Sequence, residues 1–195
     1  MALSMDELRS TVAGMRKAGL STIQISDEMS LSQDTVMWLL SSTDEGSADR
    51  PTDMRIGWRT IGVRPTRISA IGHIFADVAL EECGDDIDTV VGISLNGILF
   101  SHEISAELDC EVSIYRSLNQ DEFMGALSNK YGNVNGKKVM IVDDVLSTGT
   151  TMKQCIEHLR SDGAEVVLCA VLVNKTMLNE IEDVPLRGLI RAVMV

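Results

Sequence analysis

Runs of mostly apolar residues, many of them β-branched, mark a series of buried strands in the last two thirds of the chain. They occupy residues 88–93, 112–115, 139–142, 166–173 and 189–195. Such runs are typical of strands that are covered on both faces of a parallel sheet. Helical patterns alternate with them at 65–79, 98–108 and 152–159. The alternation predicts an α/β domain with a doubly wound parallel sheet and helices on both faces, to which residues 56–63 are expected to add a short strand.

The first 42 residues carry a purely helical pattern instead. Capping boxes, in which a serine and a Glu or Gln three positions later satisfy each other's backbone, start helices at Ser4 and Ser21. Ser32 starts a third helix over residues 33–42 after a tight turn, with Leu40 among the residues expected to face the core. Three short helices with this turn predict a helix-turn-helix whose third helix is the recognition helix.

The start of the predicted recognition helix supplies candidate DNA contacts. A Gln side chain can read adenine in the major groove, and Ser and Thr hydroxyls can contact bases or phosphates. The candidates, taken to be exposed, are Ser32, Gln33, Asp34 and Thr35, together with Met37 or Trp38. A helical bundle that serves dimerisation would leave the same pattern and stays an alternative.

A polar stretch separates the two patterns. Residues 41–55 are rich in Ser, Asp, Gly and Pro and nearly free of apolar residues, which is typical of a linker. The predicted organisation is therefore an N-terminal all-α domain over 1–42, a linker over 43–55 and an α/β domain over 56–195.

Charge and composition limit the partners, the localisation and the cysteine chemistry that can be expected. The formal net charge is −12, and residues 1–42 hold three basic against five acidic side chains. This balance works against generic affinity for nucleic acid, so DNA binding would rest on few phosphate contacts and would need a dimer. The chain shows neither a membrane span nor a signal peptide, so we expect a cytoplasmic protein without a membrane partner. The four cysteines lack C-x-x-C spacing, which favours reduced thiols over a metal site.

The stretch 139–151, VMIVDDVLSTGTT, joins a buried strand to candidate binding chemistry. Ligands bind outside the carboxyl ends of strands in open α/β sheets, and a loop of small hydroxyl residues and glycine at a helix N-terminus offers N–H groups to a phosphate. Carboxylates can accept hydrogen bonds from sugar hydroxyls. The pattern predicts a site for a phosphorylated sugar, although an acidic turn with an ordinary helix cap is an alternative. The candidate residues are Asp143, Asp144, Ser147, Thr148, Gly149, Thr150 and Thr151.

These thirteen residues resemble, at every position, the phosphoribosyl-pyrophosphate (PRPP) binding signature of type I phosphoribosyltransferases. The resemblance implies that Asp143 and Asp144 bind the ribose hydroxyls, that residues 147–151 bind the 5′-phosphate, and that Mg²⁺ accompanies the ligand without a direct protein site. A second small loop follows the strand 88–93 and is similar to the pyrophosphate loop of that family, although a simple strand-to-helix turn would look alike. Its members, to which the resemblance adds Arg116, are Ser94, Leu95, Asn96 and Gly97.

The resemblance breaks where the family places catalytic cations. Orotate phosphoribosyltransferases carry a cluster of lysines after the third strand, in a flexible hood, whereas here only Arg116 and Lys130 are basic between residues 116 and 130. Cations stabilise the charge that develops as pyrophosphate leaves, so their loss should reduce the rate more than the binding of a phosphorylated sugar. No catalytic residue is assigned.

Taken whole, the chain resembles the archaeal PyrE-like transcriptional regulators, in which a helix-turn-helix precedes a domain related to orotate phosphoribosyltransferase. The resemblance implies a homodimeric regulator that binds operator DNA and senses PRPP or a related phosphorylated sugar or nucleotide. One alternative is an active phosphoribosyltransferase for orotate or a purine base, with Lys130 or Lys137 replacing the missing lysines. Another is an RNA-binding attenuator, which the lack of a basic, aromatic face disfavours.

Overall fold

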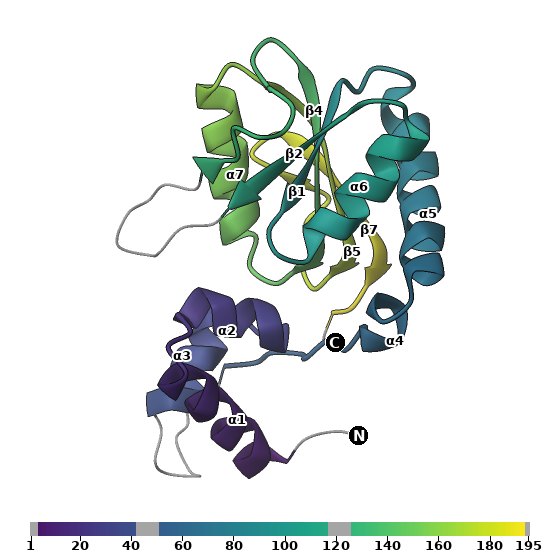
Figure 1. The fold of residues 1–195 in the computed structure, drawn as a ribbon. Helices are drawn as coiled ribbons and strands as arrows, with labels where there is room; N and C mark the ends of the chain where they lie inside the picture. Colours follow the sequence, from purple (N-terminus) through teal and green to yellow (C-terminus); the bar gives the residue numbers. More distant parts are fainter. Residues whose placement is uncertain (1–3, 42–50, 117–125, 194–195) are drawn as a thin grey trace. The chain divides into compact units, whose positions relative to one another are not determined.

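The computed structural model describes residues 4–41, 51–116 and 126–193, and it divides into two compact units, Met1–Gly57 and Trp58–Val195 (Figure 1). Each unit has a hydrophobic core of its own. None of the described helices is long and apolar enough to cross a membrane.

The first unit contains three helices, α1 (Met5–Lys17), α2 (Thr22–Met29) and α3 (Gln33–Ser41). Both predicted capping boxes form: the hydroxyls of Ser4 and Ser21 accept hydrogen bonds from the backbone N–H groups three residues on, and their own backbone N–H groups donate to the side chains of Glu7 and Gln24. The side chains that the helices share are fully or almost fully buried, namely Val12, Ile25, Met29, Leu31, Val36 and Leu39. Leu40 was expected in this core but is 38% exposed, because Val36 and Leu39 already fill the inner face of α3.

The end of the predicted linker belongs to the first unit. The backbone N–H of Ser32 donates to Oδ2 of Asp53 over 2.7 Å, so Asp53 is attached to the start of α3. The unit boundary falls after Gly57, two residues beyond the predicted end of the linker at 55. Residues 42–50 of the linker lie outside the described residues.

The second unit is built on a sheet with the strand order β3-β2-β1-β4-β5-β7-β6. Its central strands β2, β1, β4, β5 and β7 pair in parallel, whereas β3 and β6 pair antiparallel at the two edges. The strands are β1 (Thr89–Ile93), β2 (Glu111–Arg116), β3 (Ala126–Leu127), β4 (Lys138–Leu146), β5 (Glu165–Asn174), β6 (Glu180–Ile181) and β7 (Val184–Arg191).

Helices cover both faces of this sheet. Helices α5 (Pro65–Cys83) and α6 (Gly97–Glu107) lie on one face and α7 (Thr150–Ser161) on the other (Figure 1). All five residues of β1 and the apolar start of β4 are buried, as expected for strands covered on both sides. The predicted fold class is confirmed.

Three local predictions were wrong. Residues 56–63 form no strand; they contain the short helix α4 (Arg59–Gly62), closed by bonds from the N–H groups of Ile61 and Gly62 to the carbonyl of Trp58. The last described strand is 184–191 rather than 189–195, because its pairing with β5 begins earlier. Strand β4 runs on to Leu146, which pairs with Asn174, so the two acids lie within the strand and not after it.

Candidate ligand site at the carboxyl edge of the sheet

The predicted loops meet where the strand order of the sheet reverses. From β1 the chain crosses to β2 on one side, and from β4 it crosses to β5 on the other, while β1 and β4 are neighbours. Ligands of open α/β sheets bind in the crevice outside the carboxyl ends of the strands at such a switch point. Residues 94–97 follow β1 and residues 147–151 follow β4, so the topology brings the two candidate loops to one place.

Asp144 is the buried centre of this site. Its side chain is only 6% exposed, and its Oδ2 accepts hydrogen bonds from Nε1 of Trp58 at 2.7 Å and from Nδ2 of Asn96 at 3.1 Å. Burial raises the pKa of the Asp144 carboxyl above its usual range, and the hydrogen bond from Trp58 offsets part of this rise. The carboxylate is thus held in one orientation by residues from two other segments.

Asp143 differs from its neighbour in exposure. It is half-buried, and its Oδ1 accepts a hydrogen bond of 2.9 Å from the backbone N–H of Asp144. The two predicted sugar-binding acids therefore lie together within β4, near its carboxyl end, but only Asp143 offers a carboxylate that is partly exposed to solvent.

The loop 147–151 forms the N-terminus of α7. Gly149 adopts the left-handed region at φ +84°, and an added Cβ would lie 2.8 Å from Cδ1 of Ile181, so glycine is required here. The hydroxyls of Thr148 and Thr150 lie 3.0 Å apart, and both residues are exposed. Gly149, the N-cap residue, offers no side-chain cap, and the N–H of Thr150 makes only a long bond of 3.4 Å to Oγ1 of Thr148. The positive dipole end of the helix is therefore directed at the loop.

The loop 94–97 is fixed between two strands. The N–H of Ser94 donates to the carbonyl of Tyr115 over 2.8 Å, and the peptide bond between Ser94 and Leu95 is cis. Gly97 lies against β4, where an added Cβ would collide with the carbonyl oxygen of Val142. A side chain at this position would push α6 away from β4, so the glycine is required by close packing.

The cations are distributed unevenly around this edge. Arg116 ends β2 next to the loop 94–97 and is exposed. Lys137 instead precedes β4 and pairs with Glu111 at 2.7 Å, which places it at the amino edge of the sheet, away from both loops. It therefore cannot replace a lysine of the pyrophosphate site. Lys130 is exposed, and residues 117–125 of the expected hood lie outside the described residues.

The sequence left the role of Trp58, the first residue of the second unit, open between ligand contact, dimer packing and anchoring of the linker, with packing as the default. Besides its bond to Asp144, its ring contacts Phe100 with centroids 5.6 Å apart. These partners lie far away in sequence, so no local pattern could have revealed them.

The start of α3 presents fewer side chains to DNA than predicted. Thr35 is 7% exposed, and its N–H and hydroxyl are bonded to Oγ of Ser32, which acts as the helix cap. Trp38 packs against the core of the unit, with the guanidinium of Arg9 5.1 Å from its ring centre. The prediction of exposure was therefore wrong for Thr35, whereas the exposed residues on this helix include Asp34 and Met37.

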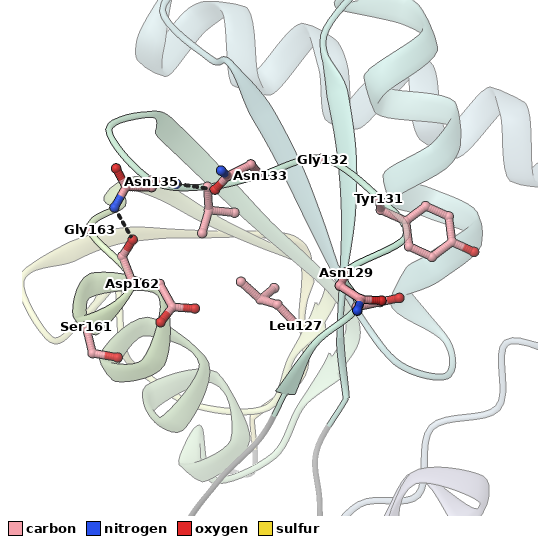
Figure 2. A pocket seen from close by; sticks show the side chains of 11 residues that line it. Leu127, Asn129, Tyr131, Gly132, Asn133, Asn135, Ser161, Asp162 and Gly163 are labelled. Atoms are coloured by element: carbon pink, nitrogen blue, oxygen red, sulfur yellow. Dashed lines mark hydrogen bonds between the residues drawn. The ribbon is translucent and has the colours of Figure 1, made fainter.

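A separate pocket of about 650 Å³ lies between residues 127–135 and the end of α7 (Figure 2). Several of its polar groups bind one another: the N–H of Asn135 donates to Oδ1 of Asn133, and the Asn135 amide donates to the carbonyl of Asp162, each over 2.9 Å. The pocket borders neither predicted loop, so it is not the candidate ligand site.

Comparison with known proteins places the chain in a family. Residues 57–183 match the model of the phosphoribosyl transferase domain, and the chain belongs to this family. Over almost its full length it is also similar to archaeal proteins named transcriptional regulator GfcR. The relative from Thermoplasma acidophilum is 37% identical over 96% of each chain, and that from Picrophilus torridus is 39% identical over 98% of this chain and 99% of its own. The resemblance to archaeal regulators is thereby confirmed.

Solved structures support the fold. An adenine phosphoribosyltransferase from Trypanosoma brucei superimposes with a TM-score of 0.58 at 19% identity, covering 74% of this chain and 72% of its own. The orotate phosphoribosyltransferase from Aeropyrum pernix gives 0.57 at 23% identity, covering 75% and 82%. The second unit has the type I phosphoribosyltransferase fold.

Proposed function

We propose that this protein is a DNA-binding transcriptional regulator that senses PRPP or a related phosphorylated sugar or nucleotide through its phosphoribosyltransferase-like domain. The observation that carries the proposal is the meeting of two loops and an oriented carboxylate at one switch point of the sheet. The full-length similarity to proteins named transcriptional regulators supports the regulatory part.

In this proposal each part of the ligand has its own partner. The N-terminus of α7 with residues 147–151 binds the 5′-phosphate, Asp143 and Asp144 accept from the ribose hydroxyls, and residues 94–97 with Arg116 bind the pyrophosphate. Two fold relatives were solved with matching groups: the Mycobacterium tuberculosis orotate phosphoribosyltransferase with PRPP, and the T. brucei enzyme with AMP, pyrophosphate and ribose-5-phosphate.

Mg²⁺ fits this site as a companion of the ligand. Phosphate oxygens are the ligands that Mg²⁺ takes most readily alongside one or two carboxylates, and Asp143 is a partly exposed carboxylate near the carboxyl end of β4. When bound, the ion would neutralise pyrophosphate charge.

The distribution of cations favours a sensor over an enzyme. Electrostatic stabilisation of leaving pyrophosphate needs cations that are already in position, and of the alternatives Lys137 lies at the wrong edge of the sheet. A ligand alters DNA affinity only through different affinities for two arrangements of the protein, and a homodimer would present two α3 helices to paired half-sites.

Calorimetric titration of PRPP with Mg²⁺ tests the proposal. Wild type should bind saturably, the Asp143→Asn/Asp144→Asn variant should lose binding at least tenfold, and Asp162→Asn, which removes an exposed carboxylate from the pocket of Figure 2, should bind like wild type. Equal binding by wild type and both variants would refute the site. Release of pyrophosphate on adding orotate or a purine base would show an active transferase instead.

A further inference from the structure

A positively charged segment runs from the last residues of the first unit into the start of the second. Residues 54–76 contain four arginines and neither Asp nor Glu, in a chain where acidic residues outnumber basic ones by 29 to 17. It is the longest run without an acidic residue in the sequence, and its four arginines compare with three basic residues in each of the next two, 8–26 and 123–142. It follows that the segment carries a local charge opposite to that of the whole protein.

Three of these arginines share one surface. Arg59, on α4, and Arg64 and Arg67, around the start of α5, line an open pocket of about 470 Å³ together with Thr60 and Val63. All three are exposed, and within the part of the chain that the structure describes no ion pair joins them to a carboxylate. Arg67 donates a hydrogen bond to the carbonyl of Thr60, which ties α4 to α5. We call these three residues the arginine surface.

The adjacent helix end strengthens the positive potential. Helix α5 has 19 residues, begins with Pro65, and has no side-chain cap at Arg64. Pro65 carries no N–H, and the N–H of Arg67 donates to the carbonyl of Arg64 over 3.0 Å. What the helix adds beside the guanidinium groups is therefore its positive dipole end, which favours an oxyanion there. Guanidinium groups remain charged and bind phosphate through two parallel N–H donors. The chemistry of the surface fits phosphate.

The helical unit has few cations with which to bind the phosphates of DNA. Helix α3 contains no Lys or Arg, and residues 1–42 are net acidic. Phosphate contacts supply essentially all sequence-independent affinity for DNA, so they must come from elsewhere. Along the chain, Arg59 follows Asp53, which is bonded to the start of α3, by six residues, at most about 21 Å of extended backbone.

We propose that the arginine surface contacts the phosphate backbone of the DNA that the helical unit reads. This inference rests on the proposed function as a DNA-binding regulator. It assigns the non-specific part of the affinity to the second unit, whereas the first unit would supply base contacts. An open surface without an enclosed polar cavity suits a duplex better than a small metabolite.

The salt dependence of DNA binding tests this surface. The probe is a fluorescein-labelled 40-base-pair duplex of mixed sequence, because backbone contacts do not need the operator. Anisotropy titrations between 20 and 200 mM KCl compare wild type with Arg59→Gln/Arg64→Gln, which leaves the Arg67 bond to Thr60 in place. The control is Lys138→Gln/Arg160→Gln, which removes the same charge from β4 and α7.

Each phosphate contact contributes about 0.9 to the slope of log K against log salt, so the double variant should lower the slope by about 2 and the affinity at 0.1 M salt by roughly 50-fold. The control should stay within about threefold of wild type. Wild-type slope in the arginine variant, or an equal loss in the control, would overturn the inference while leaving DNA binding intact. Loss of PRPP binding by the arginine variant with unchanged DNA binding would assign the surface to the ligand and also overturn it. Failure of wild type to bind the duplex at any salt concentration would overturn both this inference and the proposed function.

Discussion

The two units of this protein obtain their candidate sites in opposite ways. In the helical unit each helix start is capped by neighbours in sequence, as in the bond between Ser32 and Thr35, and only α3 also has a described bond from its start to a more distant residue, Asp53. At the sheet edge the central acid, Asp144, is held by Asn96 and Trp58, which lie 48 and 86 positions away. Local interactions make the helices of the first unit easy to locate from the sequence. They also engage some of the side chains that were candidates for DNA contact, such as Thr35. Long-range interactions orient the second site and leave its loops exposed.

The largest effect is expected from a substitution at the close contact between Gly97 and β4. Gly97→Ala should reduce the free energy of unfolding of the second unit by about 3 kcal/mol, because the new methyl group meets the backbone carbonyl of Val142. Urea denaturation followed by circular dichroism measures the change. Gly14→Ala is the matched control, since nothing lies within 4 Å of an added Cβ in α1, and it should gain about 0.5–1 kcal/mol. Equal effects of the two substitutions would contradict the packing account.

A second substitution removes one long-range donor. Trp58→Phe should cost about 1.5–3 kcal/mol, because it deprives a buried carboxylate of a charged hydrogen bond. In a Trp38→Phe background, Trp58 becomes the only tryptophan, and addition of PRPP with Mg²⁺ should change its emission. The converse protein, which keeps only Trp38, should show no such change if Trp58 is the residue that senses occupancy of the pocket.

Burial of Asp144 predicts a specific pH dependence. Its pKa is raised in the folded chain, so its charged form destabilises the fold, and wild type gains stability as pH falls through that raised pKa. Asp144→Asn should therefore melt at a higher temperature than wild type at pH 7.5, and the difference should shrink towards pH 4.5. Scanning calorimetry over this range decides the point; a constant difference would mean that burial does not govern this carboxyl.

The smallest effects separate capping from recognition at α3. Ser32→Ala should cost about 1 kcal/mol of stability in the helical unit, because it removes the cap that bonds to Thr35. Asp34→Ala, at an exposed neighbouring position, should leave stability within about 0.5 kcal/mol while altering DNA affinity. Thermal melts and duplex titrations of both variants measure these effects. An unchanged melting temperature of Ser32→Ala would contradict the assignment of Ser32 as the cap of α3.

The same contrast explains how much could be predicted from the sequence. Apolar runs and capping boxes located most helices and strands and the two candidate loops, whereas the strand order that brings these loops to one switch point came from the structure. The short helix at 59–62 was missed because it is held by backbone hydrogen bonds to the carbonyl of Trp58, which leave no periodic pattern of apolar residues in the sequence. Exposure at α3 was misjudged for Thr35, since a residue suited to DNA contact is equally suited to completing a cap. The hydrogen-bond partners of Asp144 could be identified only from the fold, because they lie far away in the sequence.

Coupling between the two units tests the account most directly. Fragments of the organism's own DNA that the protein retains would be titrated with wild type and with Asp143→Asn/Asp144→Asn, each with and without PRPP and Mg²⁺. The account predicts that the ligand changes the DNA affinity of wild type by about fivefold or more, the usual lower range of allosteric coupling, and leaves the variant unchanged. Saturable PRPP binding with no change in wild-type DNA affinity would contradict it.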